Sequence, residues 1–330
     1  MGFCIQGEAE QELPEVMLGV ARLHKLDVTL ADTLDAHDMA EEFEEDDNSD
    51  LEGGSGQMTS PQSKQMALSP ATVPLTSPGL EEMFIDSGMT HHLRTRSATY
   101  LTNGRKAHAG PAFAALLRAD LFRIDGHKHH LFRVDHICAQ GRMQDRVQAL
   151  LGGNRPPFLF VVNVQIPGDK AYSLVLCWGM RLKEAQQALT AGDLPPDDAK
   201  FVRLFTRYID LDLDGGLPSD DLRNNRLKMF PSVVEGPFLV RKAIGKPCVI
   251  GHRLTARFFR RPGYLEADID VGSNVLASNA THLASSCAKN FSLVWAFGLR
   301  GESMDELPER LIGSARIVKP DLDRAELLDG

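Results

Sequence analysis

The sequence predicts an α+β domain preceded by an acidic N-terminal arm. Three observations lead to this prediction. Strand-like and helix-like patterns occur in groups, without the alternation that βαβ units would show. Residues 252–271 show matching period-2 alternation on both sides of a turn, which indicates an antiparallel hairpin. The first 83 residues differ sharply in composition from the rest of the chain.

The arm, residues 1–83, is strongly acidic. Residues 1–82 contain 3 Lys or Arg and 18 Asp or Glu, a net charge of −15, whereas the remaining 33 basic and 27 acidic residues give +6. Apolar residues between positions 14 and 34 recur on one helical face and predict an amphipathic helix. The Glu-, Gly-, Ser- and Pro-rich stretch that follows buries too little apolar area to fold, so we predict that it is disordered.

The domain itself is expected over residues 84–320, with 321–330 as a tail. Residues 113–124 have the pattern of a helix or a strand that leads into the core. The apolar runs 158–166 and 172–178 flank a Pro-Gly-Asp-Lys turn and predict an antiparallel hairpin. Further along, residues 181–191 and 198–209 have helical patterns, and residues 210–225 read as a polar loop.

The hairpin at 252–271 turns at Pro262 and Gly263. Pairing across this turn sets apolar residues opposite each other on one face, for example Phe258 opposite Ala267. The other face sets Arg257 opposite Asp268, with Glu266 and Asp270 on the same polar side. We therefore expect a half-buried hairpin with one apolar and one polar face.

The end of the domain is expected to contain a long Ser- and Ala-rich helix over about 274–299, followed by a strand over 312–318. Combined with the strands before it, this helix predicts a curved antiparallel sheet that holds a long C-terminal helix. A START-like helix grip, as in lipid carriers, is the form of this architecture that we favour.

Composition excludes several classes. The chain has no GxSxG, GxxxxGK[ST], HExxH or GxGxxG motif, so we expect a non-enzymatic protein without a cofactor. Its five cysteines lack a CxxC pair, which favours reduced thiols and a cytoplasmic location. No apolar run reaches the ~18–20 residues of a membrane span, and no secretory signal is visible.

Two groups of residues have the side-chain types that bind metal ions. In the first, carboxylates alternate before Gly215 as in a calcium loop, but the twelfth position holds Asp where Glu is usual, so a solvated loop is the preferred alternative. The candidate ligands are Asp210, Asp212, Asp214 and Asp221. The second set lacks a helical i, i+4 pair and reads as exposed loop histidines. Its members are His127, His129, His130 and His136.

A basic cluster is the candidate for binding an anionic head group or ligand. Its members are Arg241, Lys242, Lys246, Arg253, Arg257, Arg260 and Arg261. Ordinary cross-strand charge pairing, such as Arg257 with Asp268, is the alternative interpretation. Nucleic-acid binding is not expected, because the domain's net charge is small. Gly2 and Cys4 resemble the start of dually acylated proteins, although Gln6 stands where Ser or Thr is preferred.

Four blocks follow one another along the chain. They are residues 154–168, 225–247, 264–273 and 306–313, the last of which is Glu306-Leu307-Pro308-Glu309-Arg310-Leu311-Ile312-Gly313. In sequence and in order these blocks resemble the Enhanced Disease Resistance 2 C-terminal domain family. Longer family members carry pleckstrin-homology and START domains and act as membrane-associated regulators in plants. The chain has no room for either upstream domain, so we do not carry their lipid sites over. No catalytic residues are established for the family's module, so none are transferred.

The resemblance implies a non-enzymatic module of lipid- or membrane-linked regulation, with an anionic lipid or membrane surface as partner and peripheral membrane association. A protein-interaction domain without a small-molecule ligand is the competing hypothesis. A hydrolase with an unlisted constellation is the third.

Overall fold

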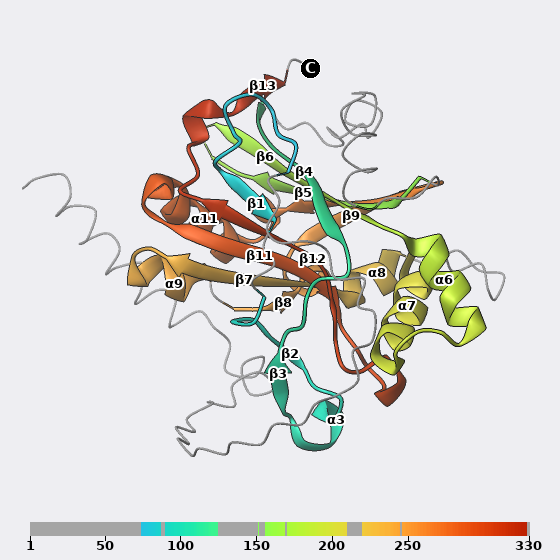
Figure 1. The fold of residues 1–330 in the computed structure, drawn as a ribbon. Helices are drawn as coiled ribbons and strands as arrows, with labels where there is room; N and C mark the ends of the chain where they lie inside the picture. The colour runs from blue at the N-terminus through green and yellow to red at the C-terminus, as the bar shows by residue number, and fades with distance from the viewer. Residues whose placement is uncertain are drawn as a thin grey trace, which may run out of the picture. The chain divides into compact units, whose positions relative to one another are not determined.

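The computed structural model describes residues 74–86, 90–124, 151, 156–168, 170–209, 220–244 and 246–328. The arm up to residue 73, including the helix predicted over 14–34, lies outside the described residues. Within them the α+β class is confirmed, because two large sheets are combined with separate helices (Figure 1).

The larger sheet has six strands and is mixed. Its order is β13 (Glu326–Leu328), β4 (Ala115–Ile124), β6 (Ala171–Met180), β5 (Phe158–Ile166), β10 (Tyr264–Asp270) and β9 (Thr255–Arg261). The predicted hairpin of β5 and β6 is confirmed as antiparallel. However, β10 runs parallel to β5, and β13 runs parallel to β4, so the expectation of a purely antiparallel sheet is wrong for this layer.

The second sheet has five strands, all antiparallel. Its order is β1 (Phe84–Asp86), β12 (Leu311–Val318), β11 (Ser292–Leu299), β7 (Leu227–Glu235) and β8 (Cys248–Val249). A small ribbon of β2 (Arg94–Arg96) and β3 (Lys106–His108) is joined through α3 (Tyr100–Asn103). The strand predicted at 312–318 is β12 and is confirmed.

The main core lies between the two large sheets. Trp178 of β6 is fully buried, donates from Nε1 to the Ser314 carbonyl of β12 at 3.1 Å, and contacts the rings of Phe160 and Phe297. A side chain at Gly313 would clash with this indole, since an added Cβ would lie 2.5 Å from its Cδ1. The close approach of the two layers therefore requires glycine at this position.

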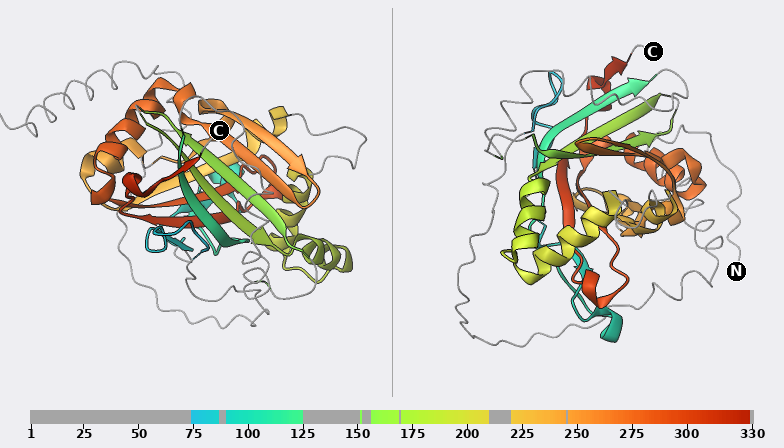
Figure 2. Two further views of the ribbon diagram at one scale, coloured as in Figure 1. Left: turned by 90° about the horizontal axis from the view of Figure 1, so that it is seen from above. Right: turned by 90° about the vertical axis from the view of Figure 1, so that its right-hand side faces the viewer.

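The helices lie at the ends of the sheets (Figures 1 and 2). At one end are α6 (Leu182–Ala191) and α7 (Pro196–Ile209), which confirm the two predicted helices, and at the other are α9 (Phe238–Ile244) and α11 (Val275–Ser286). Two shorter helices are α8 (Asp220–Arg226) and α10 (Ile250–Arg253), and the 3-10 turns are η1 (Val271–Ser273), η2 (Ala288–Asn290), η3 (Met304–Glu306) and η4 (Leu322–Arg324).

The predicted long C-terminal helix is wrong. Helix α11 begins after the Asn274 cap, whose side chain accepts hydrogen bonds from the N–H groups of Leu276 and Ala277, and it ends at Ser286. The apolar stretch that follows η2 is the strand β11, which is central in its sheet and buried on both faces. A strand covered on both faces has no alternation, so its sequence resembles that of a buried helix.

The packed part of the chain includes residues N-terminal to position 84, where the sequence placed the start of the domain. Leu75 hydrogen-bonds through its backbone to Leu117 and Ala119 on β4, and Leu80 is fully buried in the main core. Ser77 is also buried, and its N–H donates to Asp120 at 2.7 Å. Residues 75–83 thus form a strap across one edge of the larger sheet.

The hairpin of β9 and β10 has the predicted register. Phe258 pairs with Ala267, Arg257 pairs with Asp268, and Tyr264 pairs with Arg261 across the turn. Gly263 has a φ of +89°, which suits the second turn position after Pro262. The apolar face, which includes Phe258, packs against the main core.

This arrangement predicts unequal effects of two neighbouring substitutions. Phe258→Asp should lower the free energy of unfolding by about 2 kcal/mol, because the charge replaces a ring that packs edge-on against Tyr208. Phe259→Asp, on the opposite face of β9, should cost clearly less. Urea unfolding of both variants measures the difference in the free energy of unfolding. Equal losses from the two substitutions would contradict the assignment of Phe258 and Phe259 to a buried and a less buried face of β9.

Candidate functional site

The seven predicted basic residues lie on three separate segments. Helix α9 carries Arg241 and Lys242, and Lys246 follows it. Arg253 ends α10, and the remaining three arginines are on β9. All seven except Arg260 are exposed.

Strand alternation divides the β9 arginines between two faces. Arg260 lies on the side of β9 that faces the main core, where its Nε donates to the Ile209 carbonyl at 3.2 Å and its guanidinium lies 5.3 Å from the centre of the Phe158 ring. Arg257 and Arg261 lie on the other side. Arg260 is therefore held by contacts within the fold. The three arginines of β9 do not form one patch, because they lie on two faces of the strand.

Helix α9 presents an exposed surface that is both apolar and basic. Of its seven residues only Val240 is buried, and Ile244 is partly buried against the core. Phe238 is 74% exposed and Leu239 is 37% exposed. We call Phe238, Leu239, Arg241, Lys242 and Lys246 the α9 surface.

The neighbouring helix adds to the apolar character of this end of the molecule. Helix α11 packs beside α9, and its first residue, Val275, is 74% exposed. Among the described residues, large apolar side chains with such exposure are few, and the others are Leu101, Met304 and Leu327. Phe238 and Leu239 are adjacent members of that set on one helix, which makes this helix the clearest candidate for contact with an apolar partner.

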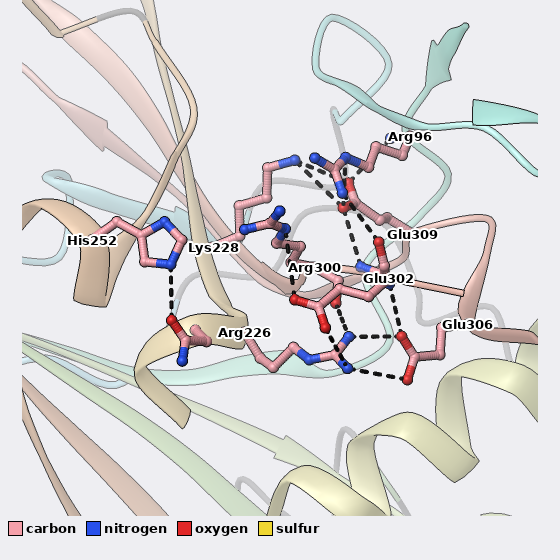
Figure 3. Close-up of polar contacts among 10 residues, drawn as sticks. Arg96, Arg226, Lys228, His252, Arg300, Glu302, Glu306 and Glu309 are labelled. Atoms are coloured by element: carbon pink, nitrogen blue, oxygen red, sulfur yellow. Dashed lines mark hydrogen bonds and ion pairs between the residues drawn. The ribbon is translucent and has the colours of Figure 1, made fainter. Parts of the chain in front are cut away.

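Sequence reasoning did not find a charged network that connects three distant segments (Figure 3). Glu309, which follows η3, is buried, and its carboxylate accepts hydrogen bonds from Lys228 Nζ at 3.2 Å, from the Arg96 N–H at 3.1 Å and from the Gly301 N–H at 3.3 Å. The Arg96 guanidinium lies over the Tyr100 ring, 4.5 Å from its centre. Burial lowers the pKa of Lys228, and the Glu309 carboxylate partly offsets this effect.

The second half of the network surrounds Arg226, the last residue of α8. Its guanidinium donates to Glu306 at 2.6 Å and to the Arg300 carbonyl at 2.9 Å, and it forms an ion pair with Glu302 at 2.9 Å. Burial alone would raise the pKa of Glu306, but the Glu302 N–H and Arg226 outweigh it and hold that pKa below its ordinary value.

The network binds the loop before β12 to α8, β7 and β2. Each carboxylate in it accepts hydrogen bonds or forms ion pairs within the chain. Arg226 and Lys228 belong to the block 225–247, and their partners Glu306 and Glu309 belong to the block 306–313. These four charged residues therefore have a structural role here. Pairing over 80 residues of sequence cannot be read from spacing, which is why the network was missed.

The polar face of the β9–β10 hairpin is not the exposed surface that the sequence predicted. Glu266 and Asp268 are buried on β10, which lies between β5 and β9 inside the sheet. Burial, together with the negative charge of Asp268 and a hydrogen bond to it, raises the pKa of Glu266 to about 9. Glu266 is therefore protonated at neutral pH.

Several predicted sites fall outside the described residues. They include Gly2 and Cys4, the four histidines, and three of the four calcium ligands, Asp210, Asp212 and Asp214. The fourth, Asp221, lies exposed in the first turn of α8. Within the described residues no group of three or more His, Cys, Asp or Glu side chains is arranged to hold a metal ion. In the same part of the chain, no helix is long and apolar enough to span a membrane.

Comparisons with known proteins identify the family. The model for the C-terminal region of the protein Enhanced Disease Resistance 2 matches residues 1–27 and 87–321. A curated relative from Arabidopsis thaliana, "Protein ENHANCED DISEASE RESISTANCE 2-like", is 29% identical over 236 residues, which is 71% of this chain and 28% of the relative. The chain thus corresponds to less than a third of that relative's length, and no solved structure matches it. The chain belongs to the Enhanced Disease Resistance 2 C-terminal domain family.

Proposed function

We propose that this domain is a non-enzymatic regulatory module that docks peripherally on anionic membranes through the α9 surface. The single observation that carries the proposal is the exposure of Phe238 and Leu239 one turn away from Arg241 and Lys242. The names of the family and of the Arabidopsis relative refer to disease resistance, which supports a regulatory role.

The physical argument combines two contributions. An exposed Phe and Leu gain hydrophobic free energy when they enter the boundary between head groups and acyl chains. Each Lys or Arg held near an anionic lipid surface contributes about 1 kcal/mol more. Because Arg241 and Lys242 follow Phe238 by three and four positions, a single orientation of α9 brings Phe238 and both basic residues to the bilayer.

The structure favours surface docking over the START-like carrier that the sequence suggested. In a helix grip the C-terminal helix would be enclosed by the sheet. In α11 only Ala284 is fully buried, and residues 276–283 are partly or fully exposed. We therefore propose that the lipid contact is made at the surface of α9, with a cytoplasmic, peripheral location.

Two double variants test the proposal. Phe238→Asp with Leu239→Asp, and separately Arg241→Glu with Lys242→Glu, should each weaken co-sedimentation with phosphatidylserine-containing vesicles. Loss of two basic contacts at ~1 kcal/mol each predicts about a 30-fold weaker affinity for the charge variant at low salt. The defect should shrink as salt rises, because screening weakens the wild-type attraction.

Matched controls come from the opposite end of the molecule and from the small ribbon. Lys183→Glu with Arg203→Glu removes two exposed basic residues from α6 and α7, and Leu101→Asp removes an exposed apolar residue from α3. These variants should bind like wild type, apart from the effect of net charge. If wild-type protein does not bind the vesicles, or if only a protein partner recognises α9, the membrane proposal is wrong.

A further inference from the structure

The strap over residues 75–83 contains the dipeptide Ser77-Pro78. No other Ser or Thr in the described residues is followed by proline. Residues 77–80 form a β-turn in which the Leu80 N–H donates to the Ser77 carbonyl at 3.2 Å. Proline at the second position and Gly79, with a φ of +87°, at the third are the residues that a type II turn prefers. Ser77 is thus the first residue of a turn that its own sequence forms.

The Ser77 side chain connects three segments. Its Oγ donates toward Asp120 of β4 at 3.1 Å and toward Glu326 of β13 at 2.7 Å, and the Ser77 N–H also donates to Asp120. A hydroxyl has a single proton, so the two carboxylates share it. Arg118 forms an ion pair with Asp120 and offsets one of the two negative charges. Ser77, Arg118 and Asp120 are all buried, so their charges and hydrogen bonds are shielded from water.

The strap and β13 cover the same edge of β4. One edge of β4 pairs with β6, and the other pairs with β13 only at residues 122–124. Leu75 covers an earlier part of this second edge, where its N–H donates to the Leu117 carbonyl and its carbonyl accepts from the Ala119 N–H, both at 2.9 Å. The Ser77 contacts lie between these two pairings along β4. Together the strap and β13 pair backbone groups that an open sheet edge would expose.

We propose that Ser77 is a phosphorylation site, and that its phosphate detaches residues 75–78 and β13 from the edge of β4. The partner is a proline-directed protein kinase, and the phosphoryl donor is a nucleoside triphosphate. The Ser77 Oγ forms a bond to the γ-phosphorus of ATP, and the bond from that phosphorus to the β–γ bridging oxygen breaks, with its electron pair leaving on ADP. The hydroxyl proton passes to the catalytic base of the kinase.

The closed strap cannot accommodate the phosphate. A phosphoryl group carries a charge of about −1.5 to −2 at neutral pH, and here it must enter the space between the Ser77 Oγ and two carboxylates. The Glu326 oxygen lies only 2.7 Å from that Oγ, so β13 has to move. Like charges repel, and the hydrogen bonds of the hydroxyl are lost. Arg118 does not compensate, because its guanidinium already pairs with the buried Asp120 at 2.5 Å.

The kinase acts on a conformation in which the strap has opened. Residues 75–77 are attached through the hydrogen bonds of Leu75 and Ser77, and Leu75 is only partly buried. Segments attached in this way open locally without global unfolding. After the turn, the fully buried Leu80 anchors the chain, and Gly79 has open space where a Cβ would lie, so the chain can pivot there. The phosphate then prevents reclosure and shifts the population to the open form.

Phosphorylation of the full chain tests the proposal. A background with Ser60→Ala and Ser69→Ala removes the other two Ser-Pro dipeptides of the sequence. ATP, Mg²⁺ and a proline-directed kinase should phosphorylate Ser77, as detected by mass spectrometry, and adding Ser77→Ala should abolish this modification. Hydrogen exchange at the Ala119 N–H, which donates to the Leu75 carbonyl, should then be at least about tenfold faster than in the unmodified protein, the effect of losing one buried hydrogen bond.

Charge variants separate repulsion from the loss of the hydroxyl. Ser77→Asp should speed exchange at Ala119 more than the neutral Ser77→Asn of similar size, and adding Glu326→Gln should reduce the effect of Ser77→Asp. Equal effects of Ser77→Asp and Ser77→Asn, or a phosphorylated chain in which the Ala119 N–H stays protected, would overturn the proposal.

A chain that remains unmodified at Ser77 would overturn it as well. A synthetic peptide of residues 72–82 then gives the reason. If the kinase modifies the peptide, the strap stays closed in the folded protein. If it does not, the sequence around Ser77 is not a substrate.

Discussion

Replacing Glu309 with alanine is expected to lower the free energy of unfolding by about 3–5 kcal/mol, the usual cost of removing one partner of a buried ion pair. The substitution leaves the ammonium of Lys228 buried without its carboxylate, and it leaves the N–H groups of Arg96 and Gly301 without their acceptor. Urea unfolding at neutral pH measures the loss.

The stability lost by Glu309→Ala should depend on pH, because the substitution leaves Lys228 unpaired. Because burial already lowers the pKa of Lys228, the unpaired amine in the variant binds its proton less tightly than in the unfolded chain. The unfolded state then holds more protons, so the variant should recover stability as pH rises toward the ordinary lysine pKa, ~10.4.

Two further variants complete the comparison. Adding Lys228→Met should restore part of the loss at neutral pH, since no charge is then stranded. Glu302→Ala removes a carboxylate that is 44% exposed and should cost under about 1 kcal/mol. Equal losses for Glu302→Ala and Glu309→Ala would contradict the burial of the network.

Replacing Glu266 with glutamine is expected to stabilise the protein at alkaline pH. The pKa of Glu266 in the folded state is raised to about 9, well above the value of ~4.3 in an unfolded chain. Between these two values the folded state holds a proton that the unfolded state has released, so wild-type stability should fall as pH rises. Glutamine keeps the shape and cannot ionise, so its variant should lack this slope.

The comparison should be made by thermal unfolding from pH 5 to 9. The midpoint of Glu266→Gln should exceed that of wild type by several degrees at pH 8, and the two should converge near pH 5. Glu184→Gln is the matched control for the loss of one carboxylate, because the Glu184 side chain is 39% exposed whereas Glu266 is buried. Parallel profiles for Glu266→Gln and wild type would show that Glu266 is ionised in the folded protein.

Local patterns predicted the parts of the fold that depend on neighbouring residues. The hairpin register around Phe258 and Ala267 follows from alternation on two adjacent strands, and α6 and α7 follow from helical spacing. The strand β11 was mistaken for helix because it is buried on both faces. The parallel pairing of β10 with β5 joins residues about 100 positions apart, and nothing in the hairpin itself specifies it.

The candidate site likewise combines features that the local sequence predicts with features that only the tertiary structure shows. The basic residues of α9 were found from composition, and the exposure of Phe238 beside them required the structure. Glu266 and Asp268 were expected on an exposed polar face, but both are buried. Alternation shows which face of a strand a side chain lies on, and it does not show whether other residues cover that face. The Glu309 network joins segments that only tertiary folding brings together.

Depth-dependent fluorescence quenching tests most directly whether α9 enters the membrane. Phe238→Trp places an indole on the α9 surface, whereas of the two native tryptophans Trp178 is fully buried and Trp295 is partly buried. With anionic vesicles that carry brominated acyl chains, the introduced indole should be quenched and its emission should shift to the blue. The same substitution at Leu101, which is 48% exposed on α3, should leave its indole unquenched. An indole at position 238 that stays unquenched while the protein is bound, or that is quenched no more than the one at position 101, would contradict docking through α9.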